Sequence, residues 1–158
     1  MLADARLETR PPTPHPPMQL PLPQSLSSDE LRSAAGWSAL RLLLAGLIAA
    51  HGWGRLLAGA VVPFGGWLSG QGFPLGFVIA AAVTAFEIIG TPLLAFRKAV
   101  FPLTVAYAFI YAMGIWLVHA PAGWFVVGLG RNGAEFSVLL IVCLLCVGLQ
   151  HVRARKGT

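Results

Sequence analysis

Residues 75–96 read LGFVIAAAVTAFEIIGTPLLAF, an apolar stretch that contains one carboxylate, Glu87. About 20 consecutive apolar residues are enough for a helix to cross a bilayer. Further stretches of this kind occur at about 38–58, 99–120 and 135–152. The sequence therefore predicts an all-α membrane protein, a bundle of four transmembrane helices within a domain at 35–152.

The composition argues against other classes of protein. The chain is 56% hydrophobic and only 11% charged, so a soluble domain of 158 residues would have too few charges to cover its apolar surface. A membrane β-barrel would need short strands of alternating polarity, and none is visible. The net charge of +5 does not indicate a nucleic-acid partner, because the basic residues flank the apolar stretches as topology determinants do.

The two ends of the chain differ from this domain. Residues 1–34 form a proline-rich cytoplasmic tail that is expected to be extended or disordered, and residues 153–158 form a basic C-terminal tail. The stretch SLSSDELRSAAGW has a helix-start pattern, with Ser27 or Ser28 as the cap. We expect a short amphipathic helix there, on the membrane surface before the first span.

The distribution of basic residues predicts the orientation. With four spans, one side of the membrane holds eight arginines and lysines: Arg6, Arg10, Arg32, Arg97, Lys98, Arg153, Arg155 and Lys156. The other side holds only Arg55 and Arg131. The positive-inside rule then places both termini of this multi-pass membrane protein in the cytoplasm. The glycine-rich loops at 59–74 and 121–134 should rest on the outer membrane surface.

The charges inside the apolar stretches need an explanation. An acidic residue at the centre of a membrane helix costs about 2.5–3.5 kcal/mol, so Glu87 should point into the bundle, toward His51 or Arg41. An ionisable group in that position is a functional-site hypothesis, and the alternative is a buried pair that fixes helix register. His119 and Glu135 lie near the outer surface, where Glu135 also suits a helix N-terminus. We expect His51, Arg55, His119 and Glu135 to rim a cluster with Glu87 at its floor.

Several short motifs occur in a characteristic order along residues 38–152. They are HGWGR at 51–55, FEIIG at 86–90, and VHAPAGWFVVGLGRNGAEFSVLL at 118–140. In this order and spacing the chain resembles the DoxX family of small four-helix membrane proteins. The resemblance implies an inner-membrane protein linked to redox chemistry, related to a subunit of thiosulfate:quinone oxidoreductase. The proline-rich tail and Arg41 lie outside the pattern.

This resemblance suggests a redox-linked subunit that binds a quinone-like molecule in a polar pocket opening to the outer face. His51 and Glu87 would be the catalytic residues and exchange protons, since histidine titrates near neutrality. Arg55, His119, Glu135 and Trp53 would contact the substrate, with Arg55 steadying an anionic oxygen. For the other aromatic residues, lining the pocket and simple packing both stay open: Tyr107, Phe109, Tyr111, Trp116 and Trp124.

Two other classes of function stay open. The chain could be a non-catalytic membrane anchor or assembly subunit for a soluble oxidoreductase, or a small-molecule or proton-coupled carrier, which four helices would best provide as a homo-oligomer. Cys143 and Cys146 form a CLLC pair within an apolar helix, where structural thiols are favoured over a redox pair. No metal site is predicted, because no single helix carries HxxxH or ExxH spacing.

Overall fold

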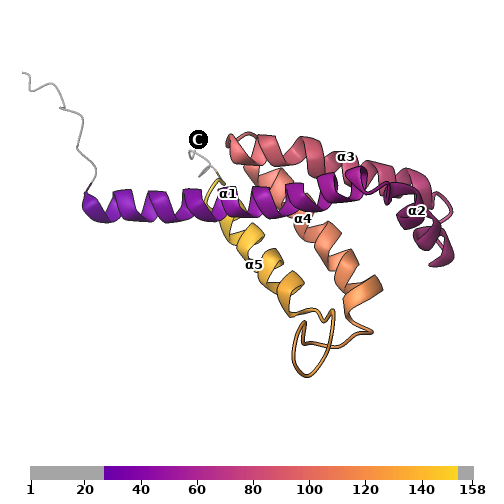
Figure 1. Cartoon of the computed structure of the whole chain (residues 1–158). Helices are drawn as coiled ribbons and strands as arrows, with labels where there is room; N and C mark the ends of the chain where they lie inside the picture. Colours follow the sequence, from indigo (N-terminus) through magenta and orange to yellow (C-terminus); the bar gives the residue numbers. More distant parts are fainter. Residues whose placement is uncertain (1–26, 153–158) are drawn as a thin grey trace, which may run out of the picture.

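The computed structural model describes residues 27–152, and within them every regular element is helical (Figure 1). The elements are α1 (Ser28–Leu57), α2 (Val61–Gly70), α3 (Gly76–Ala95), α4 (Val100–Gly114), the π-helical turn η1 (Ile115–His119) and α5 (Glu135–Leu149). Three helices are long and apolar enough to cross a membrane: α1, α3, and α4 continued by η1. The α5 helix is apolar but has only 15 residues, so the predicted all-α class is confirmed and a fourth span is not.

The start of α1 is the capped helix start that the sequence predicts. Ser27 Oγ accepts a hydrogen bond from the Glu30 amide at 3.3 Å, and Glu30 Oε2 accepts one from the Ser27 amide at 2.7 Å. This reciprocal pair satisfies two backbone donors that a helix N-terminus leaves free. The remainder of the proline-rich tail, residues 1–26, and the basic residues 153–158 lie outside the described residues.

The prediction of a separate surface helix before the first span is wrong, because α1 continues unbroken for 30 residues. No proline interrupts residues 28–57, and Gly36 costs a helix only about 1 kcal/mol. The first turns of α1 therefore project as one rigid rod beyond the rest of the bundle (Figure 1). Residues 28–34, expected in the tail, belong to this rod.

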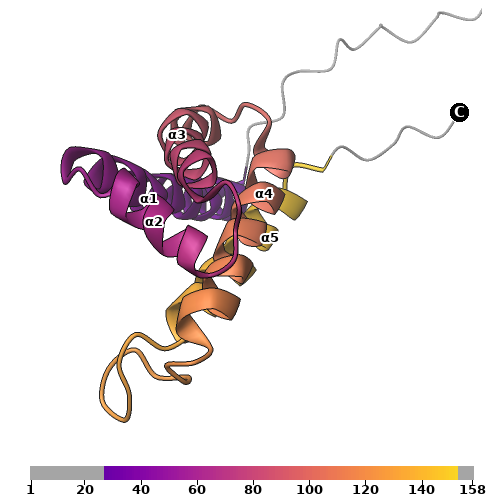
Figure 2. The same cartoon turned by 90° about the vertical axis from the view of Figure 1, so that its right-hand side faces the viewer.

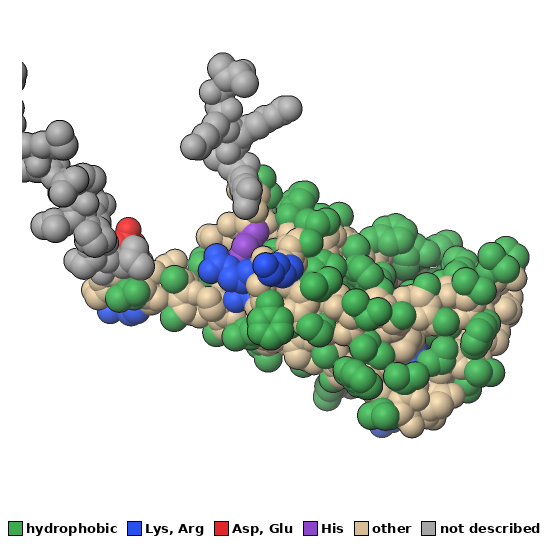
Figure 3. Space-filling model, turned by 90° about the horizontal axis from the view of Figure 1, so that it is seen from above, with side chains coloured by type: hydrophobic (Ala, Val, Ile, Leu, Met, Phe, Trp, Pro, Cys, Tyr) green, Lys and Arg blue, Asp and Glu red, His purple; other side chains and the backbone are tan. Residues whose placement is uncertain are grey.

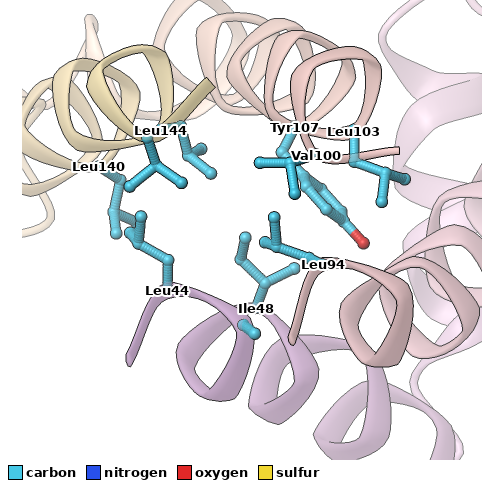
Figure 4. Packing of buried hydrophobic residues seen from close by; sticks show 10 residues of the cluster. Leu44, Ile48, Leu94, Val100, Leu103, Tyr107, Leu140 and Leu144 are labelled. Atoms are coloured by element: carbon cyan, nitrogen blue, oxygen red, sulfur yellow. The ribbon is translucent and has the colours of Figure 1, made fainter. Parts of the chain in front are cut away.

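The helices associate as two close pairs that meet at one end. The α1 and α3 helices lie side by side, as do α4 and α5, and the second pair leads obliquely away from the first (Figures 1 and 2). The pairs converge near the α3–α4 turn, where Leu44 and Ile48 of α1 pack with Leu94, Tyr107 and residues of α5 (Figure 4). Toward the opposite end they diverge, and this divergence leaves room for a cavity.

The inward face of α3 is made of small and polar residues, whereas its large apolar residues point outward. Ala80, Thr84 and Glu87 are buried, but Phe77 and Ile89 are 55% and 64% exposed. Small residues inside and bulky apolar residues outside are the arrangement expected when lipid is the surrounding solvent. The outward face of α3 is therefore suited to contact acyl chains.

The segment between the first two long helices is not the irregular loop that its glycine content suggested. Residues 61–70 form α2, which folds back against α3. Contact is close because Gly65 lies on the backbone of Phe77, where a Cβ would come within 2.6 Å of the Phe77 Cα. The glycines that suggested a loop therefore allow a backbone-to-backbone helix contact.

Candidate functional site

The close contact between α1 and α3 is centred on Gly52 and Glu87. A Cβ added to Gly52 would lie 2.8 Å from the Glu87 Cβ and 3.1 Å from Ile88 Cγ1. Only glycine leaves room for α3 at this distance. Arg55 is three residues further along α1, on nearly the same face, and is thereby placed beside the Glu87 carboxylate.

Arg55 and Glu87 form an ion pair inside the apolar part of the bundle. Arg55 Nη1 donates to Glu87 Oε2 at 2.7 Å and to Thr84 Oγ1 at 3.1 Å. The Thr84 hydroxyl in turn donates to the Ala80 carbonyl at 2.7 Å. The Arg55 guanidinium also lies over the ring of Phe64 in α2, with 4.8 Å between its central carbon and the ring centroid. One arginine thus ties α1 to both α2 and α3.

A cavity of about 410 Å³ opens beside this ion pair, within the size range of small-molecule sites. It is bounded by α1, α2, α3, α4 and η1, where the two helix pairs diverge. Its polar lining comes from five residues: His51, Arg55, Glu87, Tyr111 and His119. The rest of the lining is largely apolar and aromatic, and includes Phe64, Trp67, Phe73 and Phe109.

Two tyrosines of α4 differ in how their hydroxyl groups are satisfied. The Tyr107 hydroxyl donates to the Phe86 carbonyl at 3.1 Å. The Tyr111 hydroxyl is buried and has no hydrogen-bond partner among the described residues. The Tyr111 ring lies edge-on to the imidazole of His51, with ring centroids 6.4 Å apart. A buried hydroxyl without a partner is costly, so Tyr111 is a candidate donor to a bound molecule.

The structure brings four of the six predicted site residues together at one cavity: His51, Arg55, Glu87 and His119. Glu87 points inward, and the described residues give it Arg55 as its ion-pair partner. Trp53 is 48% exposed and does not line the cavity. It points elsewhere because it is next to buried Gly52 on α1, about 100° around the helix axis.

Glu135 does not line the cavity either. Its Oε1 accepts a hydrogen bond from the Val126 amide at 3.0 Å, and its own amide donates to the Trp124 carbonyl at 3.0 Å. Glu135 therefore organises the segment between η1 and α5. His119 takes part in both regions, because it lines the cavity while its Nδ1 lies 2.7 Å from the Asn132 carbonyl oxygen.

Arg41 has a different role from the predicted approach to Glu87. Its Nη1 donates to the Leu94 carbonyl at 2.9 Å and also to the Ala95 carbonyl. These are carbonyls of the last turn of α3, which have no partner within their own helix. Arg41 is thus a buried cap at the C-terminal end of α3, and it does not pair with Glu87.

The part of the site that the sequence did not reveal comes from α2. Phe64 and Trp67 of that helix wall the cavity, with rings stacked 6.1 Å apart between centroids. The sequence did contain a signal for these walls. Two large aromatic residues in the glycine-rich segment 59–74 need an apolar surface to pack against. Thr84 was also missed, because a threonine in a membrane helix commonly bonds only to its own backbone.

The two cysteines lie on α5 away from the cavity, as free thiols, with Cys143 half-buried and Cys146 exposed. Among residues 27–152, no three histidine, cysteine or carboxylate side chains come close enough to hold a metal ion.

Together, the helices and the cavity of residues 27–152 define a helical bundle with three helices suited to cross a membrane and a buried Arg–Glu ion pair beside an apolar pocket. Comparisons of the chain with protein-family models, with curated proteins and with solved structures give no match.

Proposed function

We propose that this chain is a DoxX-like subunit of the inner membrane that binds a quinone-like molecule in the cavity beside Arg55 and Glu87. The observation that carries the proposal is the unpartnered Tyr111 hydroxyl in the same cavity as the ion pair. A quinone ring is flat and apolar, with carbonyl oxygens that accept hydrogen bonds. The Tyr111 hydroxyl supplies a donor for one carbonyl oxygen, and the aromatic walls suit the ring.

The residues of the cavity are suited to such a group in two further respects. His51 is exposed at the cavity, and its imidazole has one nitrogen that can donate a proton and one that can accept it, so it can pass protons between water and the interior. Glu87, held by Arg55, is the second titratable group at the same cavity. A bound quinone would supply two-electron redox chemistry, and this chain would orient it and hold or move the protons.

The proposed topology has four membrane crossings with both termini in the cytoplasm. It is supported by the packing of α5 along α4, which returns the chain to the side from which α4 starts. At 15 residues and about 1.5 Å per residue, α5 is about 22 Å long. A helix of this length crosses a bilayer core of about 30 Å only with local thinning or help from flanking residues.

The test is binding of a decyl-substituted benzoquinone to the full-length chain purified in detergent, measured by titration calorimetry. We expect saturable binding that His51→Ala and Glu87→Gln weaken at least about tenfold, each variant being shown to fold by circular dichroism. Trp53→Phe is the matched control, because Trp53 is on α1 but outside the cavity. Unchanged affinity in folded His51 and Glu87 variants would overturn the proposal, and native mass spectrometry of the same samples would identify any other copurified molecule.

A further inference from the structure

A second cavity lies at the opposite end of the bundle from the proposed quinone site. Its volume is about 500 Å³. The residues around it come from the projecting part of α1, from the α3–α4 turn and from the segment that follows α5, and they include Asp29, Glu30, Trp37, Arg41, Arg97 and His151. Basic and histidine side chains gather on this face, in the notch beside the projecting rod of α1 (Figure 3).

The cavity is at the depth of lipid headgroups if α3 crosses the membrane. Of its lining residues, Arg97 lies in the turn between the end of α3 at Ala95 and the start of α4 at Val100, and Gln150 and His151 directly follow the end of α5 at Leu149. The apolar segments of three helices thus stop at its level. Trp37, which lines it, is half-buried and of the residue type that is enriched at membrane interfaces.

Two guanidinium groups supply the basic part of the cavity. Arg41 is buried, and among the described residues only its Nη1 is bonded, to the carbonyls at the end of α3. Arg97 is exposed in the turn and has no ion-pair partner among residues 27–152. Arginine guanidinium groups recognise phosphate through paired hydrogen bonds, and basic pockets between membrane helices are established sites for lipid headgroups.

The same cavity also has an acidic side. Asp29 and Glu30 line it from the first turn of α1, where Asp29 pairs with Arg32 and Glu30 closes the capping box. A ligand that carried only negative charge would face two carboxylates there. A ligand that carried only positive charge would face two arginines. The lining is therefore complementary to a group with a phosphate at one end and an ammonium at the other.

His151 adds a hydrogen-bond acceptor to this lining. Its Nδ1 lies 2.9 Å from the Val147 carbonyl oxygen, which can only accept, so the ring proton is on Nδ1. In the neutral ring Nε2 is then an acceptor, and it has no partner among the described residues. An ammonium with N–H groups can donate to such an acceptor and to the carboxylates, whereas a trimethylated ammonium cannot.

We propose that this cavity is a binding site for the headgroup of a phosphatidylethanolamine-type lipid. Arg41 and Arg97 contact the phosphate, Asp29 and Glu30 face the ammonium, and Trp37 lies between these two groups along α1. The site is separate from the quinone cavity, and its occupancy does not depend on the function proposed there. A lipid bound here joins α1, the α3–α4 turn and the end of α5.

The experiment measures lipid adducts on the full-length chain by native mass spectrometry in detergent. The probes are dihexanoyl lipids with ethanolamine, choline and glycerol headgroups, together with free phosphorylethanolamine. We expect the ethanolamine lipid to bind at least about tenfold more tightly than the other probes. Equal binding of the three lipids, or equally tight binding of free phosphorylethanolamine, would overturn the proposal.

Three variants locate the site. Arg97→Asn removes the charge without backbone strain, because asparagine tolerates the φ of +61° at this position. It should weaken ethanolamine-lipid binding about tenfold, whereas the neighbouring Lys98→Asn, which is exposed and outside the cavity, should not. Glu30→Gln keeps the capping box, and it should reduce the preference for ethanolamine while improving binding of the anionic glycerol lipid. Equal losses in the Arg97 and Lys98 variants would show diffuse surface charge and refute the site.

Discussion

Arg55 Nη1 lies 2.7 Å from Glu87 Oε2, and this ion pair joins α1 to α3 within the apolar part of the bundle. The two side chains are only 19% and 4% exposed. Removing two charges from water is expensive, so the attraction between them mostly offsets the cost of burying them. The intact pair therefore adds little net stability. Removing only one of its partners, in contrast, should destabilise the protein strongly.

The first prediction concerns this asymmetry. Arg55→Met leaves the buried Glu87 carboxylate without its cation, and we expect a loss of about 3–5 kcal/mol in the free energy of unfolding. The double variant Arg55→Met, Glu87→Met removes both charges and should recover most of that stability. Reversible unfolding of the detergent-solubilised chain, followed by circular dichroism, measures both.

The same double variant separates a structural pair from a functional one. If the ion pair only fixes helix register, the refolded double variant should bind a benzoquinone as the parent chain does. Our proposal requires that it fold and fail to bind. A double variant as unstable as Arg55→Met alone would contradict the account of the pair given above.

The second prediction concerns the helix contact that positions the pair. Gly52→Ala places a methyl group 2.8 Å from the Glu87 Cβ, so α1 and α3 must separate, at a cost of about 1–3 kcal/mol. Gly54→Ala is the matched control, because no atom lies within 4 Å of its added methyl. Alanine at that position should raise helix stability by up to about 1 kcal/mol. Opposite signs of the two shifts in Tm are expected, and two shifts of the same sign would be evidence against a tight contact at Gly52.

The third prediction uses the two tyrosines of α4. Tyr107→Phe removes the hydrogen bond to the Phe86 carbonyl and should cost about 1 kcal/mol in stability. Tyr111→Phe removes a buried hydroxyl that has no partner among the described residues, so stability should stay equal or rise. Benzoquinone affinity should show the reverse pattern, with a loss of about tenfold only in Tyr111→Phe. A destabilised Tyr111→Phe variant would mean that the hydroxyl already has a partner within the protein.

Much of the fold could be predicted from the sequence because bilayer thickness sets the length of an apolar helix. The stretch at 75–96 matched α3 to within a residue at each end for that reason. The cap at Ser27 was also readable, since the capping box is a local hydrogen-bond pattern. The end of α5 was placed too late, because the predicted span at 135–152 ran on through Gln150 and His151, whereas the helix ends at Leu149.

The ion-pair partner of Glu87 was predicted wrongly, because His51 or Arg41 was expected beside it and the structure places Arg55 there. Helical geometry placed His51, Arg41 and Arg55 on α1. It did not give the position along α1 at which α3 makes contact. That position is set by the close approach at Gly52, a tertiary contact that no local pattern encodes. The same contact leaves Arg41 level with the end of α3, where it bonds to carbonyl groups instead. The α2 walls of the cavity were missed because glycines read as loop residues when their packing partner is unknown.

The last prediction concerns Glu135, a predicted substrate-binding residue that lies away from the cavity. Because its Oε1 accepts from the Val126 amide, Glu135→Ala should free that amide and speed its hydrogen exchange, while benzoquinone affinity stays unchanged. Glu135→Gln keeps an acceptor oxygen and should retain most of the protection. Amide exchange followed by mass spectrometry of peptides from 120–134 measures the difference. A loss of benzoquinone binding in Glu135→Ala, with exchange unaltered, would instead return Glu135 to the binding site.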